Sequence, residues 1–423
     1  MRRIFPLSLL LVFIGCTPSS RISKTQVTGI QNNEVLKNAH VGISVYDATD
    51  RRTIYEYQSD KYFVPASNTK IPTCYVGLKY LSDSMTTFRY AISGDTIFIQ
   101  PSGDPVFLHP EFSFQPAFEL VKRYQHVVVE DAGFKDFLGS GWSWNDYLAS
   151  YMAQRSDLPM YGNVARFRFQ NGSVSVQPNY FTGSVTTGFI APTGFGLEKP
   201  WEENVFHITN GQATAATIPF RPDFKTMLAL LGDTLKSSVY KASRSKNYPF
   251  TIATQKTDSM LTPMMHRSDN FFAEQTLVMA ANNFLGKMSL SQMIDTVMKT
   301  EFSSLPQKPR WVDGSGLSRY NLFTPASFVS ILDKMQQEFG MERIKNIFPT
   351  GNEGTLTGYY TQLPGRIYAK TGTLSGVVAL SGYIYSKQNK LLIFSVLVNN
   401  HQSTAQQVRR TVEAFLNGIA EQN

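Results

Sequence analysis

The sequence predicts an α+β protein whose two ends build one antiparallel sheet with helices on both sides, interrupted by an inserted β-rich domain. Two strand-like runs form a hairpin near the start, at residues 40–47 and 53–60. Three more occur near the end, at residues 366–374, 377–386 and 390–400. The turns between them are short, which favours antiparallel pairing.

The composition narrows the class of protein. Of 423 residues, 42% are hydrophobic and 17% are charged, so the chain has enough apolar material for a core and is not intrinsically disordered. Its two cysteines, Cys16 and Cys74, exclude a disulfide-dense scaffold and a cysteine-built zinc cluster. The net charge of +8 comes from basic residues spread along the chain, so it does not argue for nucleic-acid binding. We expect no metal and no cofactor.

The first residues predict export as a lipoprotein. Arg2 and Arg3 precede a short apolar stretch at residues 7–14, which cannot span a bilayer. Gly15 and Cys16 then end a segment that resembles a bacterial lipobox, so residues 1–16 would be a lipoprotein signal peptide and Cys16 would carry the lipid that anchors the protein to a membrane. An ordinary signal peptide with an incidental cysteine is the alternative. Either way, we expect a periplasmic protein of the bacterial cell envelope.

The remaining chain divides by texture. Residues 17–37 are polar and rich in Ser and Thr, as expected of a tether. Residues 38–85 and 252–423 would form one discontinuous catalytic domain, closed by a helix near the C-terminus. Residues 86–251 carry many short β-like runs separated by Gly, Asn and Asp, which predicts one or two inserted β-rich domains.

A helix follows the first hairpin. Its apolar side chains repeat at helical spacing and predict an amphipathic helix that opens near Ser67. These side chains are Ile71, Cys74, Tyr75, Leu78 and Leu81.

Ser67 and Lys70 lie three residues apart on that helix and share its apolar face. A serine nucleophile needs a base within hydrogen-bond reach, and a buried lysine can be that base because desolvation favours its neutral form. The same spacing occurs at Ser238 and Ser243, in a polar stretch with no apolar helix behind it. On its own, the Ser67 pattern also fits a cap serine followed by a surface lysine.

Two further motifs lie downstream. Ser268 and Asn270 open a second helix, although a plain helix cap would look the same. Ser-x-Asn also occurs at Ser143 and Ser245, with no comparable helix behind it.

The third motif lies in a C-terminal strand. Lys370 and Gly372 share one face of that strand, and Thr371 and Thr373 share the other. The glycine permits close approach of another backbone. A cation with two hydroxyls suits the binding of a substrate carboxylate.

In this order, the three motifs match the signature of penicillin-binding proteins and β-lactamases. The chain resembles the D-alanyl-D-alanine carboxypeptidase/endopeptidase family of class C penicillin-binding proteins over most of residues 40–415. The resemblance implies a penicillin-binding/β-lactamase-like transpeptidase fold, and that family also inserts extra domains between its first two motifs. Matching stretches are PSGDP (101–105), GWSWND (141–146), YGN (161–163), DGSGLSRYN (313–321), EGTL (353–356) and AKTGTLSGVVALSGYI (369–384).

The resemblance also implies residue roles. Ser67 would be the acylated nucleophile and Lys70 its general base. Ser268 and Asn270 would complete the proton relay and hold the substrate amide. The segment from Lys370 to Thr373 would bind the terminal carboxylate, and the backbone N–H groups of Ser67 and Thr373 would form the oxyanion hole.

The implied substrates are peptidoglycan stem peptides ending in D-Ala-D-Ala and their D-Ala–diaminopimelate cross-links. β-Lactams would acylate Ser67 as covalent inhibitors. One alternative is a β-lactamase, for which Tyr161-Gly162-Asn163 fits a Tyr-x-Asn motif, whereas PWEEN (200–204) fails the Glu-x-x-x-Asn pattern. The other is a non-catalytic envelope lipoprotein that only binds peptidoglycan.

Overall fold

The computed structural model describes residues 29–188, 193–242 and 247–422 of the chain. The predicted signal peptide with Cys16, and the first part of the predicted tether, lie outside the described residues. Within those ranges, no helix combines the length and the hydropathy needed to cross a membrane.

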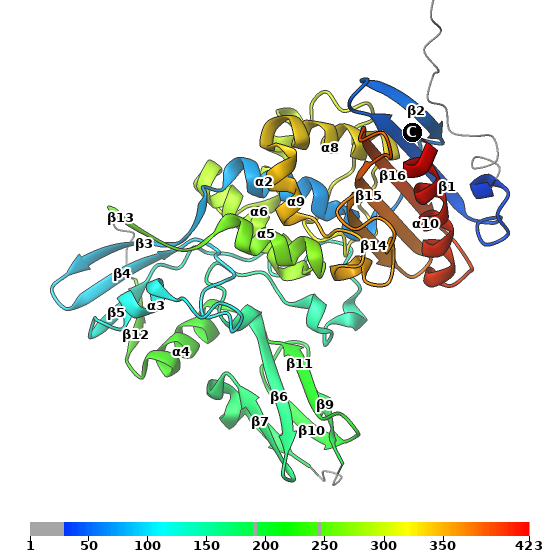
Figure 1. Cartoon of the computed structure of the whole chain (residues 1–423). Coiled ribbons are helices and arrows are strands. Elements are labelled where there is room, and N and C mark those ends of the chain that lie inside the picture. Colours follow the sequence, from blue (N-terminus) through cyan, green and yellow to red (C-terminus); the bar gives the residue numbers. More distant parts are fainter. Residues whose placement is uncertain (1–28, 189–192, 243–246, 423) are drawn as a thin grey trace, which may run out of the picture.

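One five-stranded antiparallel sheet joins both ends of the chain (Figure 1). Its strand order is β14-β15-β16-β1-β2. His40 of the first strand faces Asn399 of the last, and Asn399 also faces Val377, so the two chain ends share one sheet as predicted. The strands are β1 (His40–Asp47), β2 (Arg52–Tyr57), β14 (Ile367–Leu374), β15 (Val377–Tyr385) and β16 (Leu391–Asn399).

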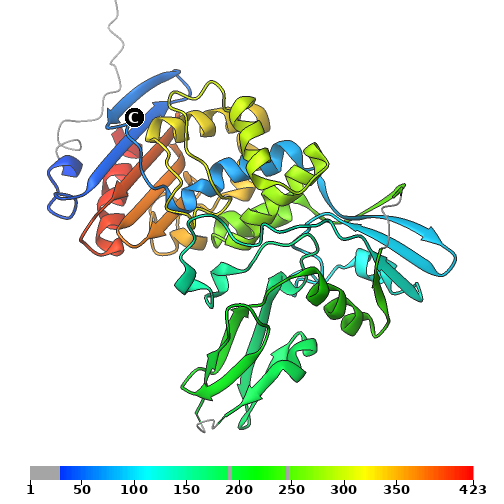
Figure 2. The ribbon, with the colours of Figure 1, turned by 180° about the vertical axis from the view of Figure 1, so that it is seen from behind.

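Helices cover both faces of this sheet (Figures 1 and 2), which confirms the predicted α+β class. On one face, Leu416 of the C-terminal helix packs in a core with Val45. On the other, Phe328 belongs to a larger core that includes Leu397. The helices of this domain are α2 (Lys70–Tyr80), α5 (Thr257–His266), α6 (Asn270–Leu285), α7 (Leu290–Lys299), α8 (Pro325–Phe339), α9 (Met341–Ile347) and α10 (Ala405–Gln422).

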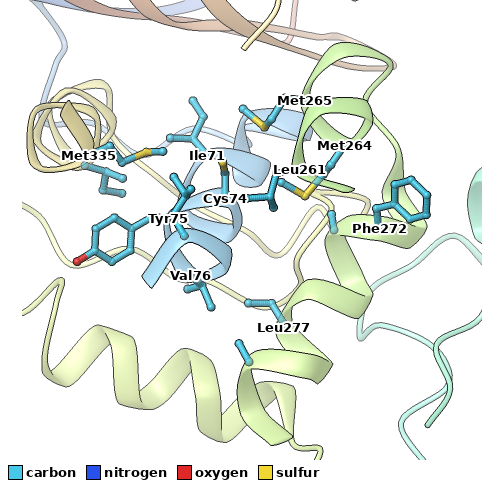
Figure 3. Close-up of a cluster of buried hydrophobic side chains, with 14 of the residues drawn as sticks. Ile71, Cys74, Tyr75, Val76, Leu261, Met264, Met265, Phe272, Leu277 and Met335 are labelled. Carbon is cyan, nitrogen blue, oxygen red and sulfur yellow. The ribbon is translucent and has the colours of Figure 1, made fainter. Parts of the chain in front are cut away.

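Helix α2 runs through the middle of the helical layer (Figure 3). Residues 70–78 are all buried, and Cys74 packs among side chains of α5 and α6 such as Leu261. The predicted apolar positions are therefore core positions, but the helix is not amphipathic, because α5, α6 and α8 surround it. The chain enters it through a single 3-10 turn, η1 (Ala66–Thr69), so Ser67 lies just before the α-helix.

The folded part of the chain begins earlier than predicted. The sequence predicts a tether over residues 17–37, but Ile30 is 2% exposed and Leu36 is 3% exposed. Both pack into the core beneath α10. These two apolar side chains stand alone in a polar stretch, so the average composition of the segment conceals them. Residues from about 30 onward belong to the folded domain.

The inserted region leaves and re-enters the main domain through two paired strands, β3 (Ser84–Ser93) and β13 (Phe250–Lys256). The predicted boundaries at residues 86 and 251 therefore fall inside these strands. Between them the chain forms one five-stranded sheet, β12-β5-β4-β3-β13, and two three-stranded sheets, β11-β6-β7 and β8-β10-β9. Val127 and Phe206, from different sheets, belong to a single hydrophobic cluster.

Two helices of the inserted region, α3 and α4, were not indicated by its β-rich texture. The elements of this region are β4 (Thr96–Pro101), α3 (Pro116–Val121), β5 (His126–Val129), η2 (Trp144–Asp146), η3 (Ser150–Met152), η4 (Tyr161–Asn163), β6 (Val164–Gln170), β7 (Ser173–Gln177), η5 (Asn179–Ser184), β8 (Val185–Thr187), β9 (Phe195–Glu198), β10 (Phe206–Asn210), β11 (Ala215–Pro219), α4 (Phe224–Leu235) and β12 (Val239–Lys241).

A buried carboxyl group joins the two linking strands. Asp104 is 1% exposed and accepts hydrogen bonds from Thr87 Oγ1 at 2.7 Å and from the Val106 backbone N–H at 2.9 Å. The Thr87 hydroxyl also contacts the Thr254 hydroxyl of β13. Burial raises the pKa of Asp104 to about 7, so this carboxyl group is easier to protonate in the folded chain than in the unfolded one.

We expect the melting temperature of Asp104→Asn to rise relative to the unaltered chain between about pH 5 and about pH 8. A carboxyl group whose pKa is raised by folding contributes stability at low pH and loses it as the pH rises through the folded-state pKa. Asparagine does not ionise, so the difference should reach on the order of 2–4 kcal/mol. Thermal denaturation followed by circular dichroism measures it. The exposed Asp295→Asn is the control, and a pH-independent difference for Asp104→Asn would contradict this account.

Candidate active site

The three motifs meet at a cleft of about 710 Å³ between the main sheet, α6 and part of the inserted region. The candidate residues that line it directly are Ser67, Ser268, Asn270 and Thr373. Those buried behind its surface are Lys70, Lys370, Thr371 and Gly372. In the part of the chain that the structure describes, no group of three or more His, Cys, Asp or Glu side chains could hold a metal ion.

Lys70 Nζ is the centre of the site. It donates hydrogen bonds to Ser67 Oγ at 3.0 Å, to Asn270 Oδ1 at 2.6 Å and to the Ser315 carbonyl oxygen at 2.7 Å. Three acceptors match the three N–H donors of an ammonium group. A cap serine followed by a surface lysine does not describe this geometry, because Lys70 is 0% exposed. Asn270 is itself oriented by a hydrogen bond from Nδ2 to the Tyr151 carbonyl oxygen at 3.1 Å.

Burial lowers the pKa of Lys70 to about 8. The carboxylates of Asp313, Glu274 and Asp269 act against this shift, in that order of strength. A lysine with a pKa near neutrality can accept a proton and return it within one catalytic cycle. The site can therefore activate a hydroxyl group within hydrogen-bond reach of Lys70.

The loop of residues 313–321 supplies the carbonyl acceptor for Lys70. Its first residue, Asp313, is 0% exposed, and its carboxylate fixes the turn that presents the Ser315 carbonyl. The sequence marks this stretch as part of the family resemblance without giving it a role. Donors to the Asp313 carboxylate are the backbone N–H groups of Gly316 (2.9 Å) and Ser318 (2.7 Å), Trp142 Nε1 (2.9 Å) and Asn321 Nδ2 (2.7 Å).

A buried glutamate on α6 supports the same loop. Glu274 is 0% exposed and accepts a hydrogen bond from the Ser315 backbone N–H at 2.7 Å. Burial, with a further contribution from Asp313, raises the pKa of Glu274 to about 7, and Arg155 Nη1 lies 3.4 Å from its Oε2. Sequence reasoning missed Asp313, Glu274 and Arg155. A signal existed for Glu274 alone, which lies four residues after the asparagine of the second motif and so shares its helix face.

Gly372 lets β14 pass directly against the turn that carries the predicted nucleophile. A Cβ atom at this position would lie 2.7 Å from the Pro65 carbonyl oxygen and 3.1 Å from the Ser67 backbone nitrogen. Asn68 Nδ2 donates a hydrogen bond to the Lys370 carbonyl oxygen at 2.8 Å, which holds the strand in place. Two stretches of backbone this close can direct paired N–H groups at one oxyanion.

The other face of β14 carries the threonines. Thr371 Oγ1 bonds to Thr355 Oγ1 at 2.8 Å, and Arg409 of α10 donates from Nη2 to Thr373 Oγ1 at 2.6 Å. Lys370 is 0% exposed, and burial together with two neighbouring cations lowers its pKa well below the usual value. The cation that contacts the Thr373 hydroxyl is therefore Arg409, a residue that sequence reasoning missed.

Strained backbone borders both motif serines. Ala66, just before the first serine, has a φ of 47°, and Ser268 has a φ of 64°. Both values lie in the left-handed region, which costs free energy for residues other than glycine. Gly316 accommodates the first of these, because a side chain there would collide with the Ala66 carbonyl oxygen.

The Tyr-x-Asn candidate lies away from the cleft. Tyr161 bonds through its hydroxyl to Thr234 Oγ1 at 3.0 Å, inside the inserted region. Asn163 is buried and donates from Nδ2 to the Gln154 carbonyl oxygen at 2.8 Å. Neither Tyr161 nor Asn163 lines the cleft. The hydrogen bond from Lys70 reaches Asn270 instead, so Ser268 and Asn270 hold the second-motif position.

Comparison with known families covers most of the chain. The D-Ala-D-Ala carboxypeptidase 3 (S13) family matches residues 24–184 and 203–422. The chain belongs to this family. The S13 chain is 28% identical over 154 residues to the D-alanyl-D-alanine carboxypeptidase DacB of Haemophilus influenzae, an alignment that covers 34% of this chain and 32% of the relative. It is 38% identical over 101 residues to a D-alanyl-D-alanine carboxypeptidase of an Actinomadura species, covering 22% of this chain and 19% of the relative. These alignments span a third or less of the relatives' length.

Solved structures extend the S13 match to the whole fold. The crystal structure of penicillin binding protein 4 from Haemophilus influenzae has a TM-score of 0.75 at 18% identity, covering 93% of this chain and 99% of that chain. A predatory endopeptidase from Bdellovibrio bacteriovorus, in complex with an immunity protein, has a TM-score of 0.55 at 14% identity, covering 91% and 94%. At these identities the likeness concerns the fold, and it confirms the predicted penicillin-binding fold class.

We expect Gly372→Ala to slow acylation by a labelled penicillin by at least about 100-fold. The new Cβ atom would push β14 away from the Ser67 backbone. The rate of adduct formation measures this effect, and a melting curve shows whether the variant folds. Gly183→Ala, where a Cβ atom meets nothing within 4 Å, is the matched control. An unchanged rate for Gly372→Ala would argue against the close approach of strand and turn.

We expect the second-order rate of penicillin acylation to rise with pH and to level off above about pH 8, because only neutral Lys70 can take the serine proton. Glu274→Gln should move this rise to lower pH, since its carboxylate helps to raise the pKa of Lys70. Stopped-flow labelling across the pH range gives both profiles. A flat profile for the unaltered chain, or a rise that moves to higher pH in Glu274→Gln, would refute the assignment of Lys70 as the base.

Proposed function

We propose that this chain is a serine-type D-Ala-D-Ala carboxypeptidase and endopeptidase that acts on peptidoglycan stem peptides through an acyl-enzyme on Ser67. One observation carries the proposal. Lys70 Nζ lies 3.0 Å from Ser67 Oγ and 2.6 Å from Asn270 Oδ1, in a buried site that lowers its pKa to about 8. A hydroxyl group, a base and a substrate-facing amide are thus held together.

In the first half-reaction, neutral Lys70 takes the proton of the Ser67 hydroxyl while Oγ attacks the carbonyl carbon of the penultimate D-alanine. The oxyanion of the tetrahedral intermediate lies between the backbone N–H groups of Ser67 and Thr373. The intermediate collapses, the peptide bond breaks, and the leaving amine receives the proton from Lys70 through Ser268.

In the second half-reaction, water attacks the ester carbonyl carbon and gives its proton to Lys70. The ester bond breaks, and Lys70 returns the proton to Ser67 Oγ, which restores the resting site. Thr373 and Arg409 hold the terminal carboxylate of the substrate, because a guanidinium beside a hydroxyl is a strong carboxylate partner. A D-Ala–diaminopimelate cross-link offers a carboxylate at the same place, so one site serves both activities.

Family membership and two solved complexes support this reaction. The Haemophilus influenzae penicillin binding protein 4 has been solved in complex with a β-lactam, and the Bdellovibrio bacteriovorus endopeptidase in a form acylated by penicillin G. By the same chemistry, β-lactams would acylate Ser67 as covalent inhibitors of this chain.

The position in the cell follows from the N-terminal sequence. We infer that residues 1–16 direct export and that Cys16 carries a lipid, which would anchor the enzyme to a membrane of the bacterial cell envelope and leave its catalytic domain in the periplasm. In this arrangement residues 38–85 and 252–423 form the catalytic domain, and residues 86–251 form the inserted domain beside it.

Digestion of purified cross-linked muropeptides by the full chain tests the proposal. We expect release of D-alanine and loss of cross-links, both followed by mass spectrometry, and we expect Ser67→Ala to abolish both. Ser238→Ala is the matched control, because Ser238 has the same Ser-x-x-Lys spacing but lies exposed on the inserted region. Release of D-alanine by Ser67→Ala would remove Ser67 as the nucleophile.

Two alternatives give different results with β-lactams. A β-lactamase would turn over a chromogenic cephalosporin well beyond one equivalent, whereas the proposed enzyme forms a long-lived adduct. A non-catalytic binding protein would form no adduct with labelled penicillin.

A further inference from the structure

A second hollow, of about 260 Å³, adjoins the catalytic cleft on the side of the inserted region. Tyr151, Ser268 and Asn270 line both the cleft and this hollow. Beyond them, the walls come from the inserted region and include Arg166 of β6 and His109. A chain that lies across the catalytic cleft can therefore continue into this space without turning back.

The two arginines of the hollow have different partners. Arg267 pairs with both acidic residues of the hollow, Asp269 at 3.0 Å and Glu111 at 2.5 Å. Arg166 donates a hydrogen bond from Nη1 to the Tyr161 carbonyl oxygen at 2.9 Å, and makes no ion pair with any other described residue. One guanidinium is thus neutralised twice, and the other not at all by direct contact.

The environment of Arg166 favours an anionic partner. Its side chain is half-buried, and the loss of water lowers the pKa of its guanidinium, an effect that Glu111 offsets only in part. A cation deprived of water gains free energy from a carboxylate at hydrogen-bond distance, and the planar fork of arginine binds a carboxylate through two parallel bonds. Burial lowers the pKa of His109 to about 4, so the neighbouring imidazole is neutral and does not compete for an anion.

The glycine beside Arg166 keeps this approach open. Gly162 lines the hollow, and a Cβ atom there would lie 3.6 Å from Arg166 Nη2. A further hollow of about 350 Å³ on the inserted region is also lined by Arg166. The guanidinium therefore lies between two concave surfaces that continue the line of the catalytic cleft.

We propose that this hollow binds a second carboxylate of the substrate peptide, on the N-terminal side of the scissile bond, through Arg166. The proposal rests on the proposed function, in which Thr373 holds the terminal carboxylate and Asn270 holds a peptide amide. Since the hollow begins past Asn270, the part of the substrate that enters it is the part that precedes the scissile bond. The inserted region thereby selects acidic stem peptides.

Binding to a chain that cannot turn over tests this proposal. The probes are two synthetic stem pentapeptides ending in D-Ala-D-Ala, identical except that the free carboxylate of the glutamate is an amide in the second. We expect Ser67→Ala to bind the acidic peptide about tenfold more tightly than the amidated one, as isothermal titration calorimetry would measure. Adding Arg166→Gln should abolish this preference. Adding Arg168→Gln, which removes the same charge from an exposed position on the same strand, should preserve it.

Equal affinities of Ser67→Ala for the two peptides, or no binding of either, would overturn the proposal, as would a preference that survives Arg166→Gln. Arg166→Lys keeps the charge and should retain part of the preference, so the comparison stands even if a melting curve shows that Arg166→Gln does not fold. The unaltered chain separates the two proposals. If it releases no D-alanine from either peptide, the proposed reaction fails, while the affinities measured on Ser67→Ala still decide the role of Arg166.

Discussion

The burial of Lys70 is the constraint on which the rest of the site depends. Removing an ammonium group from water costs several kcal/mol, and a buried lysine without compensation simply loses its proton. Here its three direct acceptors are all uncharged oxygens, from a hydroxyl, an amide and a carbonyl. The nearby carboxylates act from a greater distance, which leaves the pKa near 8. A carboxylate bonded directly to Nζ would hold the proton too firmly for a base that must take it and return it.

The compensation extends into the inserted region. Glu274 and Asp313 are buried carboxylates that repel each other, and both need partners. Arg155 approaches Glu274 and bonds to Asp136 at 2.8 Å on its other side, and Trp142 donates to Asp313. These three partners come from residues 86–251. The inserted region therefore contributes to the electrostatics of the catalytic lysine, and it is more than an appendage that guides substrate.

The parts of this site that the sequence predicts are those whose spacing is local. Ser67 and Lys70 share one turn, and the face of β14 that carries Gly372 follows from strand alternation. Arg155 and Arg409 carry no such signal, because an arginine far along the chain looks like any surface cation until the fold brings it to the cleft. The same limit applies to Ile30: composition averages over a window, whereas burial depends on which surface a side chain meets.

The cleft itself forms between the two ends of the chain. The nucleophile follows β2, and the carboxylate-binding strand β14 comes some 300 residues later, so their geometry depends on contacts across that distance. Asn399 of β16 bonds to both the backbone N–H and the carbonyl of Val64, at 2.8 Å and 3.0 Å, and Asn68 bonds to Lys370. The insertion leaves these contacts intact because β3 and β13 depart and return as neighbouring antiparallel strands, so its two ends lie together. A region added at such a point changes what surrounds the cleft without separating its two halves, and for this reason it can take on the recognition of substrate while the main sheet keeps the chemistry.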